Sequence, residues 1–314
     1  MTEADNIEVF FEPEVERHDP ALYQHEGLAT GIKADEALAD RARKMLADQG
    51  FVLVQGLLSA SDLEKAATEL RELTTSNHPR CDMIWFEGGL RHHLQLSSED
   101  DREMDGKRAG SGFTLGQSGQ QLPPLDPLFR ADFVRKVMGF IDRNPGLRAL
   151  AQHPEIVGLV TELIATSPQL FQEMALIKPP EGREKPWHQD QAYFNLPLDT
   201  PVLGVWIPFG SATPMNGCMH VLRGAHRQGP RPHFKRRDWQ ICDTDVEMEA
   251  RLAVPMEPGD VLFFDGKLPH GTPINRTNEQ RWAVQYHYCP KSAVQVDDAE
   301  RLNAFGSEGK NVTC

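Results

Sequence analysis

The stretch Pro186–Tyr193, with the sequence PWHQDQAY, places a histidine and a carboxylate two residues apart. In an extended segment, the side chains at positions i and i+2 point to the same face, so His188 and Asp190 can approach one metal ion together. Two ligands do not make a site. The stretch therefore predicts a metal centre only if the rest of the chain supplies a third ligand and a use for the open coordination positions.

The composition bounds the class of protein. With 39% hydrophobic and 25% charged residues, the 314-residue chain has the make-up of a soluble globular protein. Its length alone does not force a division into two domains, because all-β domains often reach about 200–250 residues as one unit. The chain is therefore expected to form a single domain, 1–314. A net charge of −13 argues against nucleic acid or an anionic membrane as the main partner. The expected partner is a small molecule, and the sequence leaves the oligomeric state open.

The cysteines and the N-terminal segment bear on the cellular compartment. The five cysteines are odd in number and widely spaced, without a CxxC pair, which argues against a disulfide framework or a thiolate zinc site. The acidic segment 1–5 lacks the apolar run of a signal peptide. No apolar stretch approaches the roughly 18–20 residues that span a membrane. These features predict a cytoplasmic protein.

The first part of the chain predicts a helical flank over about 31–75. Asp35 can cap a helix with apolar residues on one face, and the apolar run at 51–54 indicates a short buried strand. The residues at 61–64 (SDLE) form a capping-box pattern that would open a helix over roughly 61–74. Together these patterns predict a helix, a strand and a second helix packed against a larger body.

The stretch 76–130 is rich in Ser, Gly, Asp and Pro, and this composition predicts a partly ordered loop. So long a segment without regular structure inside a compact domain is usually functional. We therefore interpret 76–130 as a lid or substrate loop. Beyond it, helical patterns are predicted at about 131–142 and 146–165.

From residue 168 onward, short strand-like runs alternate with Gly, Pro and Asn turns. Many short strands of this kind favour a double-sheet jelly roll. The predicted fold class is therefore mainly β with flanking helices, in a cupin-like barrel. The runs lie at 169–178, 202–209, 218–222, 252–256, 260–265 and 280–289.

His270 is the candidate for the third ligand. It follows the predicted strand 260–265 and lies between Pro269 and Gly271, where a turn would present its imidazole to a cavity. Two histidines and one carboxylate on one face of a metal leave three positions open, which is the arrangement of non-haem Fe(II) oxygenases. A cosubstrate that carries a carboxylate can chelate two of these positions, and dioxygen can take the third.

Arg281 gives the open positions a use. It begins the last predicted strand, in which Arg281, Ala283, Gln285 and His287 share one face. If this face lines the interior of the barrel, a permanent cation lies in a closed space, which is costly without an anionic partner. A carboxylate that both arms of the guanidinium can bind is the partner that fits best.

The ordered set His188, Asp190, His270 and Arg281 resembles the phytanoyl-CoA dioxygenase (PhyH) family. This family consists of Fe(II)- and 2-oxoglutarate-dependent oxygenases with a double-stranded β-helix. The resemblance covers about 35–75 and 169–290. It includes the segments QEMALIKPP at 172–180, GVWIP at 204–208, NGCM at 216–219, GAH at 224–226 and PGD at 258–260.

The resemblance implies a role for each matched position. The first three residues of the ordered set would hold Fe(II), and Arg281 would bind the C5 carboxylate of 2-oxoglutarate. Gln172 and Trp206 fall where the family places residues near the cosubstrate or the metal. The implied activity is that of a dioxygenase, which hydroxylates an unactivated C–H bond of a small molecule, anionic substrates included. Such an enzyme consumes O₂ and releases succinate and CO₂.

Two alternative functions stay open at this point. A cupin-type metal hydrolase or isomerase would use a similar triad to activate water. A non-catalytic sensor would bind 2-oxoglutarate or another small acid. Arg281 argues against the hydrolase, because a hydrolase needs no clamp for a cosubstrate, and the complete triad argues against the sensor.

Two further features each have two interpretations. The basic stretch near residue 230 is either a solvated charged run or a recognition site for an anionic substrate. His287 is either a support for the metal site or a strand histidine with ordinary hydrogen bonds, and we favour the latter. The basic stretch consists of Arg227, Arg231, Lys235, Arg236 and Arg237.

Overall fold

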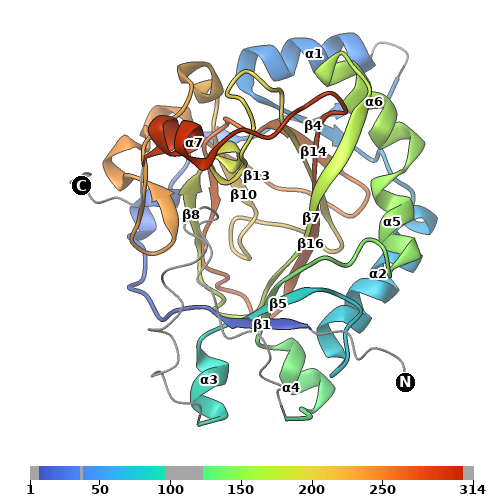
Figure 1. Cartoon of the computed structure of the whole chain (residues 1–314), viewed down its shortest axis with the longest axis vertical. Coiled ribbons are helices and arrows are strands. Elements are labelled where there is room, and N and C mark those ends of the chain that lie inside the picture. The colour runs from blue at the N-terminus through green and yellow to red at the C-terminus, as the bar shows by residue number, and fades with distance from the viewer. Residues whose placement is uncertain (1–6, 36–37, 96–122, 307–314) are drawn as a thin grey trace.

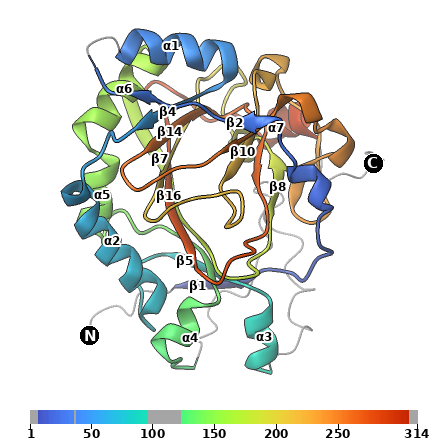
Figure 2. The same ribbon diagram turned by 180° about the vertical axis from the view of Figure 1, so that it is seen from behind.

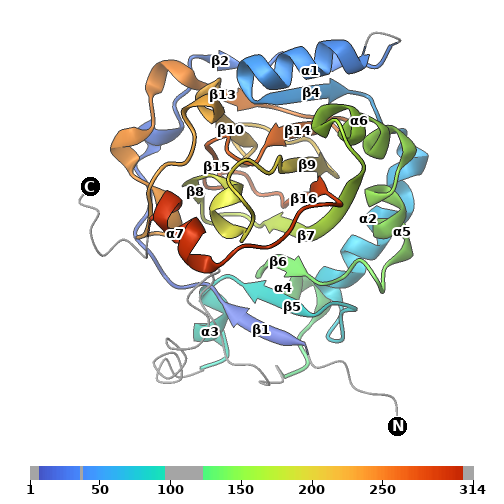
Figure 3. The same cartoon turned by 45° about the horizontal axis from the view of Figure 1, so that its top comes forward.

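The structure is a computed structural model that describes residues 7–35, 38–95 and 123–306. Its centre is a barrel of two facing β-sheets, which confirms the predicted jelly-roll class (Figures 1 and 3). The larger sheet contains, in spatial order, β1 (Glu8–Phe11), β5 (Met83–Phe86), β6 (Val134–Met138), β7 (Pro168–Lys178), β16 (Arg281–Pro290), β9 (Leu203–Pro208), β14 (Val261–Asp265), β4 (Phe51–Gln55) and β3 (Ile32–Lys33). The smaller sheet contains β2 (Gly27–Leu28), β13 (Arg251–Val254), β10 (Met219–Leu222), β15 (His270–Thr272) and β8 (Lys185–His188). A separate hairpin joins β11 (His233–Lys235) to β12 (Trp239–Ile241).

Strand β16 divides the interior of the barrel from the helical layer. Because successive side chains of a strand point to opposite faces, Val284, Tyr286 and Tyr288 turn outward into the main apolar core. The Tyr286 hydroxyl donates to the Leu147 carbonyl at 2.9 Å, so it anchors the sheet to the helices that cover it. Arg281, Ala283, Gln285 and His287 turn the other way, as the sequence predicted. The covering helices are α1 (Leu38–Gln49), α2 (Ala60–Thr75), α5 (Pro145–Ala151) and α6 (Pro154–Ile164). In Figures 1 and 2, α2, α5 and α6 lie along one side of the barrel and α1 lies across its top.

The predicted helix–strand–helix flank is confirmed, with one correction at its second helix. The helix α2 begins at Ala60, and Ser59 caps it rather than Ser61. The Asp62 backbone N–H donates to the Ser59 hydroxyl at 3.3 Å, and the Ser59 backbone N–H donates to the Asp62 carboxylate at 2.7 Å. Both serines have an acidic residue three positions later, so the pattern alone could not choose between them.

The stretch 76–130 differs from the predicted loop. Residues 83–86 form β5, which pairs with β1 in parallel and with β6 in antiparallel fashion. The short helices α3 (Gly89–His93) and α4 (Pro127–Ala131) lie beside these strands, at the bottom of Figure 1. Part of this stretch therefore extends the larger sheet. The remaining part of the predicted lid, 96–122, lies outside the described residues.

The predicted helix at 131–142 is wrong, because its centre is strand β6. Val134, Val137 and Met138 are all buried, and their spacing of three and four residues mimics one face of a helix. A register shift between Trp85 and Phe86 on the neighbouring strand breaks the regular alternation of β6. The predicted helix at 146–165 consists of the two helices α5 and α6, since Pro154 starts a new helix.

The C-terminal helix α7 (Asp298–Phe305) covers the chain next to the predicted metal site. The Arg301 guanidinium donates to the Ala192 carbonyl at 2.8 Å, and Phe305 packs with Ala192 and Trp239. Within the described ranges, no helix has both the length and the apolar character needed to cross a bilayer.

Candidate metal centre

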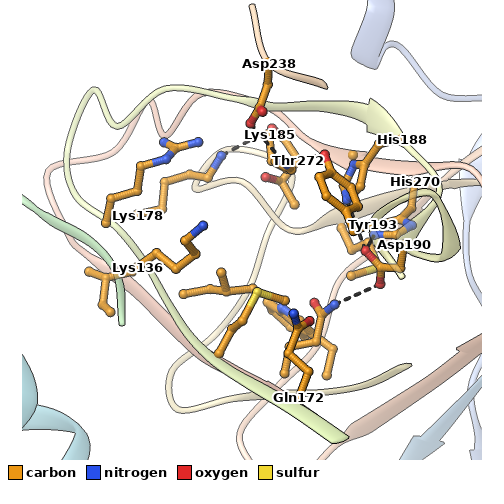
Figure 4. Close-up of a pocket in the computed structure, with 18 of the residues that line it drawn as sticks. Lys136, Gln172, Lys178, Lys185, His188, Asp190, Tyr193, Asp238, His270 and Thr272 are labelled. Atoms are coloured by element: carbon orange, nitrogen blue, oxygen red, sulfur yellow. Dashed lines mark hydrogen bonds and ion pairs between the residues drawn. The ribbon is translucent and has the colours of Figure 1, made fainter. Parts of the chain in front are cut away.

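The structure brings the three predicted ligands together inside the barrel. His188 ends β8 and His270 begins β15, and the two residues are direct partners across these antiparallel strands. Asp190 follows at the start of a 3₁₀ helix (Asp190–Tyr193). The extended segment that we considered for His188 and Asp190 therefore ends before Asp190. One ligand atom from each residue lies within 4.8 Å of the other two (Figure 4). All three side chains are buried.

Hydrogen bonds fix the orientation of both imidazoles. The Nδ1 atom of His188 lies 2.8 Å from the Pro186 carbonyl, and the Nδ1 atom of His270 lies 2.9 Å from the Leu268 carbonyl. A carbonyl accepts, so each Nδ1 carries the proton and each Nε2 presents its lone pair. Burial lowers the pKa of His270 to about 4, which keeps this ring neutral near neutral pH. Both rings are therefore ready to bind a metal through Nε2.

The two oxygens of Asp190 have different surroundings. Oδ1 lies 3.3 Å from Nε2 of His188 and 3.5 Å from Nε2 of His270. Oδ2 lies 2.9 Å from Nε2 of Gln285 and 2.8 Å from Nε2 of His287. Burial alone would raise the pKa of Asp190, but the neighbouring His270 and His287 hold it well below its usual range. The carboxylate is thus ionised, with Oδ1 facing the two ligand histidines.

His287 contradicts our preferred interpretation of it as an ordinary strand histidine. Its ring is fully buried and reaches the carboxylate of a predicted metal ligand. Its contact with Asp190 joins residues 97 positions apart in the chain, and no local pattern signals such a contact. The alternating face of the last strand was the one available signal, because it put His287 on the same side as Arg281.

A second support lies behind the metal-binding stretch and was missed by the sequence analysis. The Gln189 backbone N–H donates to Nε2 of His233 at 3.0 Å, while the Gln189 side chain donates to the Lys267 carbonyl at 2.6 Å. Burial lowers the pKa of His233 to about 3, so its ring is a neutral acceptor. These bonds tie the backbone between His188 and Asp190 to the start of β11 and to the turn at Lys267.

Arg281 lies in the same pocket as the triad. Its side chain is buried, and among the described residues it has no carboxylate within ion-pair distance. Its one hydrogen bond runs from Nη1 to the Leu176 carbonyl at 3.4 Å, and its Nε has no partner. The guanidinium carbon lies 5.2 Å from the centre of the Trp206 ring. Burial lowers the pKa of Arg281 to about 10, which still leaves it charged.

The remaining two predicted residues line this pocket as well. Gln172 lies on β7 opposite His287, and Trp206 lies on β9 opposite Gln285. Lys136 on β6 also lines the pocket, and burial lowers its pKa to about 7 (Figure 4). The sequence analysis missed Lys136 because it assigned 131–142 to a helix.

The profile of the phytanoyl-CoA dioxygenase (PhyH) family matches residues 46–283, which is more than half of the chain. The chain belongs to this family. Members of this family are Fe(II)- and 2-oxoglutarate-dependent oxygenases, and this chain brings together a buried His-Asp-His group that could hold a metal ion. The donor set fits this chemistry, because two imidazoles and a carboxylate suit Fe(II) and a buried, unpaired guanidinium suits a carboxylate.

Three PhyH relatives illustrate the similarity. A probable phytanoyl-CoA dioxygenase of Caenorhabditis elegans is 31% identical over 172 residues, which cover 50% of this chain and 54% of that protein. The peroxisomal phytanoyl-CoA dioxygenase of Mus musculus is 22% identical over 306 residues, which cover 93% of this chain and 78% of that protein. The methylphosphonate hydroxylase of Gimesia maris is 29% identical over 148 residues, which cover 46% of this chain and 54% of that protein. The first and third matches thus span about half the length of the relatives.

Solved structures share the fold of this PhyH-family chain. EvdO2 from Micromonospora carbonacea, in complex with 2-oxoglutarate, superposes with a TM-score of 0.59 at 21% identity, covering 88% of this chain and 98% of that one. The non-haem α-ketoglutarate-dependent epimerase SnoN from nogalamycin biosynthesis gives a TM-score of 0.58 at 21% identity, covering 84% of this chain and 87% of that one. At these identities the likeness concerns the fold.

The basic stretch divides into exposed and buried cations. Arg227, Lys235 and Arg236 are exposed, as the solvated interpretation expects, whereas Arg231 and Arg237 are not. Arg231 is buried and binds the Glu247 carboxylate at 3.0 Å. Arg237 is buried and binds Glu184 and Asp243, the latter at 2.7 Å. These two cations are neither solvated nor available to a substrate, because carboxylates elsewhere in the chain already neutralise them.

Replacing Arg237 with alanine is expected to lower the free energy of unfolding by about 3–5 kcal/mol, because it leaves Glu184 buried without its cation. Replacing the neighbouring Arg236, whose side chain is 43% exposed, should cost at most about 1 kcal/mol. Urea unfolding of both variants would measure the difference. Unchanged stability of the Arg237 variant together with a raised substrate KM would return this residue to substrate recognition.

Proposed function

We propose that this PhyH-family protein hydroxylates an unactivated C–H bond of a small molecule, anionic substrates included, and releases succinate and CO₂. In this proposal His188, Asp190 and His270 hold Fe(II), and Arg281 binds the C5 carboxylate of 2-oxoglutarate. The observation that carries the proposal is the buried, unpaired Arg281 guanidinium in the same pocket as the triad. A cation placed there without a counter-charge is destabilising unless a ligand supplies one.

The residues around the triad prepare the site for this chemistry. The Pro186 and Leu268 carbonyls hold the two imidazoles with Nε2 toward the metal position. The Trp206 ring beside Arg281 limits the directions in which the guanidinium can point. Iron, when bound, supplies the activation of O₂ that no side chain can supply.

The polar and the apolar side chains of the pocket have different proposed roles. Gln172 and Trp206 line the same pocket as the triad and Arg281, and we propose that they contact the cosubstrate or its immediate surroundings. Met174, Leu176 and Phe194 add apolar side chains to the lining of the same pocket, and we propose that they exclude water from it. A dry pocket strengthens the attraction between Arg281 and a carboxylate, because the local dielectric constant falls.

The alternative functions have less support. A cupin-type hydrolase or isomerase would use a metal-bound water and would have no use for Arg281. A sensor would need the cosubstrate clamp and would not need a metal triad with both imidazoles oriented by hydrogen bonds. We also propose that residues 1–314 act as one catalytic domain in the cytoplasm, with 31–75 as its helical flank.

The test is substrate-stimulated succinate release by the Fe(II)-loaded protein. The panel contains acyl-CoAs, amino acids, small secondary metabolites and phosphonates, the last because one relative is a methylphosphonate hydroxylase. A true substrate should raise succinate release and gain one oxygen atom in a mass spectrum, and the signal should vanish without Fe(II) or 2-oxoglutarate. Conversion of a substrate at an unchanged rate without 2-oxoglutarate would refute the proposal and favour the hydrolase or isomerase.

A further inference from the structure

The Asp190 carboxylate is held from one side by two side chains of β16. Gln285 donates from its amide to Oδ2 at 2.9 Å, and the Nε2 atom of His287 lies 2.8 Å from the same oxygen. The Gln285 and His287 nitrogens are themselves 3.0 Å apart, so both groups converge on one oxygen. Oδ1 makes neither contact and faces the ligand histidines.

Strand β16 keeps these two side chains in place. It pairs along its length with β7 on one side and with β9 on the other, so it lies inside the larger sheet. Gln285 is opposite Met174 and Trp206, and His287 is opposite Gln172 and Gly204. The backbone that carries the two donors therefore has little freedom to move, and neither does the oxygen that they bind.

His287 has no competing polar role among the described residues. Its ring is fully buried, its centre lies 5.0 Å from the Phe194 ring and 6.1 Å from the Phe171 ring, and its Nδ1 has no hydrogen-bond partner. An unpaired polar atom in an apolar setting is costly. Among the described residues, the ring's one hydrogen bond runs from Nε2 to Asp190, which points to a task at the carboxylate.

We propose that Gln285 and His287 are positioning residues that make Asp190 a one-oxygen ligand. A carboxylate can bind a metal through one oxygen or through both. With one oxygen, the triad leaves three coordination positions, enough for a chelating cosubstrate and O₂. With both oxygens, Asp190 would occupy one of those positions. The two donors compete with the metal for Oδ2 and so keep the third position open; this inference rests on the proposed function.

The experiment measures metal affinity and 2-oxoglutarate affinity separately, without O₂ or substrate. The variants are Gln285→Leu and His287→Phe, which remove a donor at similar volume, and His287→Gln, which restores an amide donor. Tyr286→Phe is the control, because it alters the outward face of the same strand and removes only the bond to Leu147. Thermal unfolding identifies any variant that fails to fold, and Gln285→Leu and His287→Phe then serve as independent tests.

Loss of one such supporting contact usually costs about 10–100-fold in metal affinity or activity. We expect that loss in the affinity for 2-oxoglutarate, measured by calorimetry on the Mn(II)-loaded protein, while Mn(II) affinity stays within a few-fold of wild type. His287→Gln should recover most of the loss. Crystals of Mn(II)-loaded His287→Phe should have both Asp190 oxygens at bonding distance from the metal.

Two results would overturn the inference. An equal loss of Mn(II) affinity and 2-oxoglutarate affinity would show that the two residues have a general structural role. Unchanged 2-oxoglutarate affinity in both Gln285→Leu and His287→Phe would show that they have no role in cosubstrate binding. These outcomes differ from failure of the proposed function. In that case the wild-type protein itself would bind 2-oxoglutarate no better with Mn(II) than without it.

Discussion

Replacing His188 with alanine is expected to abolish succinate formation and to remove the bound iron. His188 and His270 face each other across β8 and β15, and the loss of one leaves a single imidazole and a carboxylate. The loss of residues that merely support metal ligands costs about 10–100-fold in metal affinity or activity, so the loss of a ligand itself should exceed 100-fold. Metal content after dialysis and succinate formation at saturating 2-oxoglutarate measure the two effects.

His226 supplies the control for this prediction. It is a partly buried histidine whose Nε2 lies 3.2 Å from the Ala47 carbonyl, away from the triad. His226→Ala should retain iron and activity if the protein stays folded. Full activity of the His188 variant, or iron loss of the same size in both variants, would remove His188 from the metal site.

Replacing Arg281 with alanine is expected to raise the KM for 2-oxoglutarate by about 100-fold. Truncation of one partner of a desolvated, hydrogen-bonded charge pair costs about 2–5 kcal/mol, and each 1.4 kcal/mol corresponds to a factor of ten. Arg281→Lys keeps the charge and loses the two-armed geometry, so it should fall between the alanine variant and wild type. Initial rates of succinate formation against 2-oxoglutarate concentration, at saturating substrate, give the KM values.

The same variant has a second, thermodynamic readout. In the absence of 2-oxoglutarate, Arg281 is a buried cation without a carboxylate partner among the described residues, so its removal should not lower stability as the loss of a paired charge would. Added 2-oxoglutarate should raise the melting temperature of the metal-loaded wild type and have little effect on Arg281→Ala. An unchanged KM and an equal ligand-induced shift in both proteins would place Arg281 outside the cosubstrate site.

The sequence predicted correctly those parts of the fold in which apolar and polar residues alternate, or repeat at helical spacing, without interruption. Strand β16 alternates without interruption from Arg281 to His287, and for this reason its inward and outward faces were both correct. Strand β6 has its apolar residues at helical spacing next to an irregular pairing, and it was assigned to a helix. Strands β8 and β15, which carry His188 and His270, have only four and three residues, too few to reveal any period.

The contacts that complete the site could not be predicted, because they depend on distant parts of the chain. The contacts of Asp190 with Gln285 and His287 depend on the position of β16 between β7 and β9 in the larger sheet. The charge of Arg237 is neutralised by Glu184, which lies 53 positions earlier in the chain. A pattern of residue types identifies a donor or a cation, and the fold decides what it meets.

A metal bound by both His188 and His270 would be part of the architecture of the smaller sheet. Strand β8 forms the edge of the smaller sheet as far as the chain is described, and there it pairs with β15 alone. An ion bound by both histidines would cross-link two strands that are far apart in the chain, and part of its binding free energy would stabilise the pairing of β8 with β15. Lys185 and His188 of β8 also form a wall of the pocket. Loss of the metal would therefore do more than remove the catalytic centre. It would also weaken the pairing of β8 with β15, and so make one wall of the pocket less rigid.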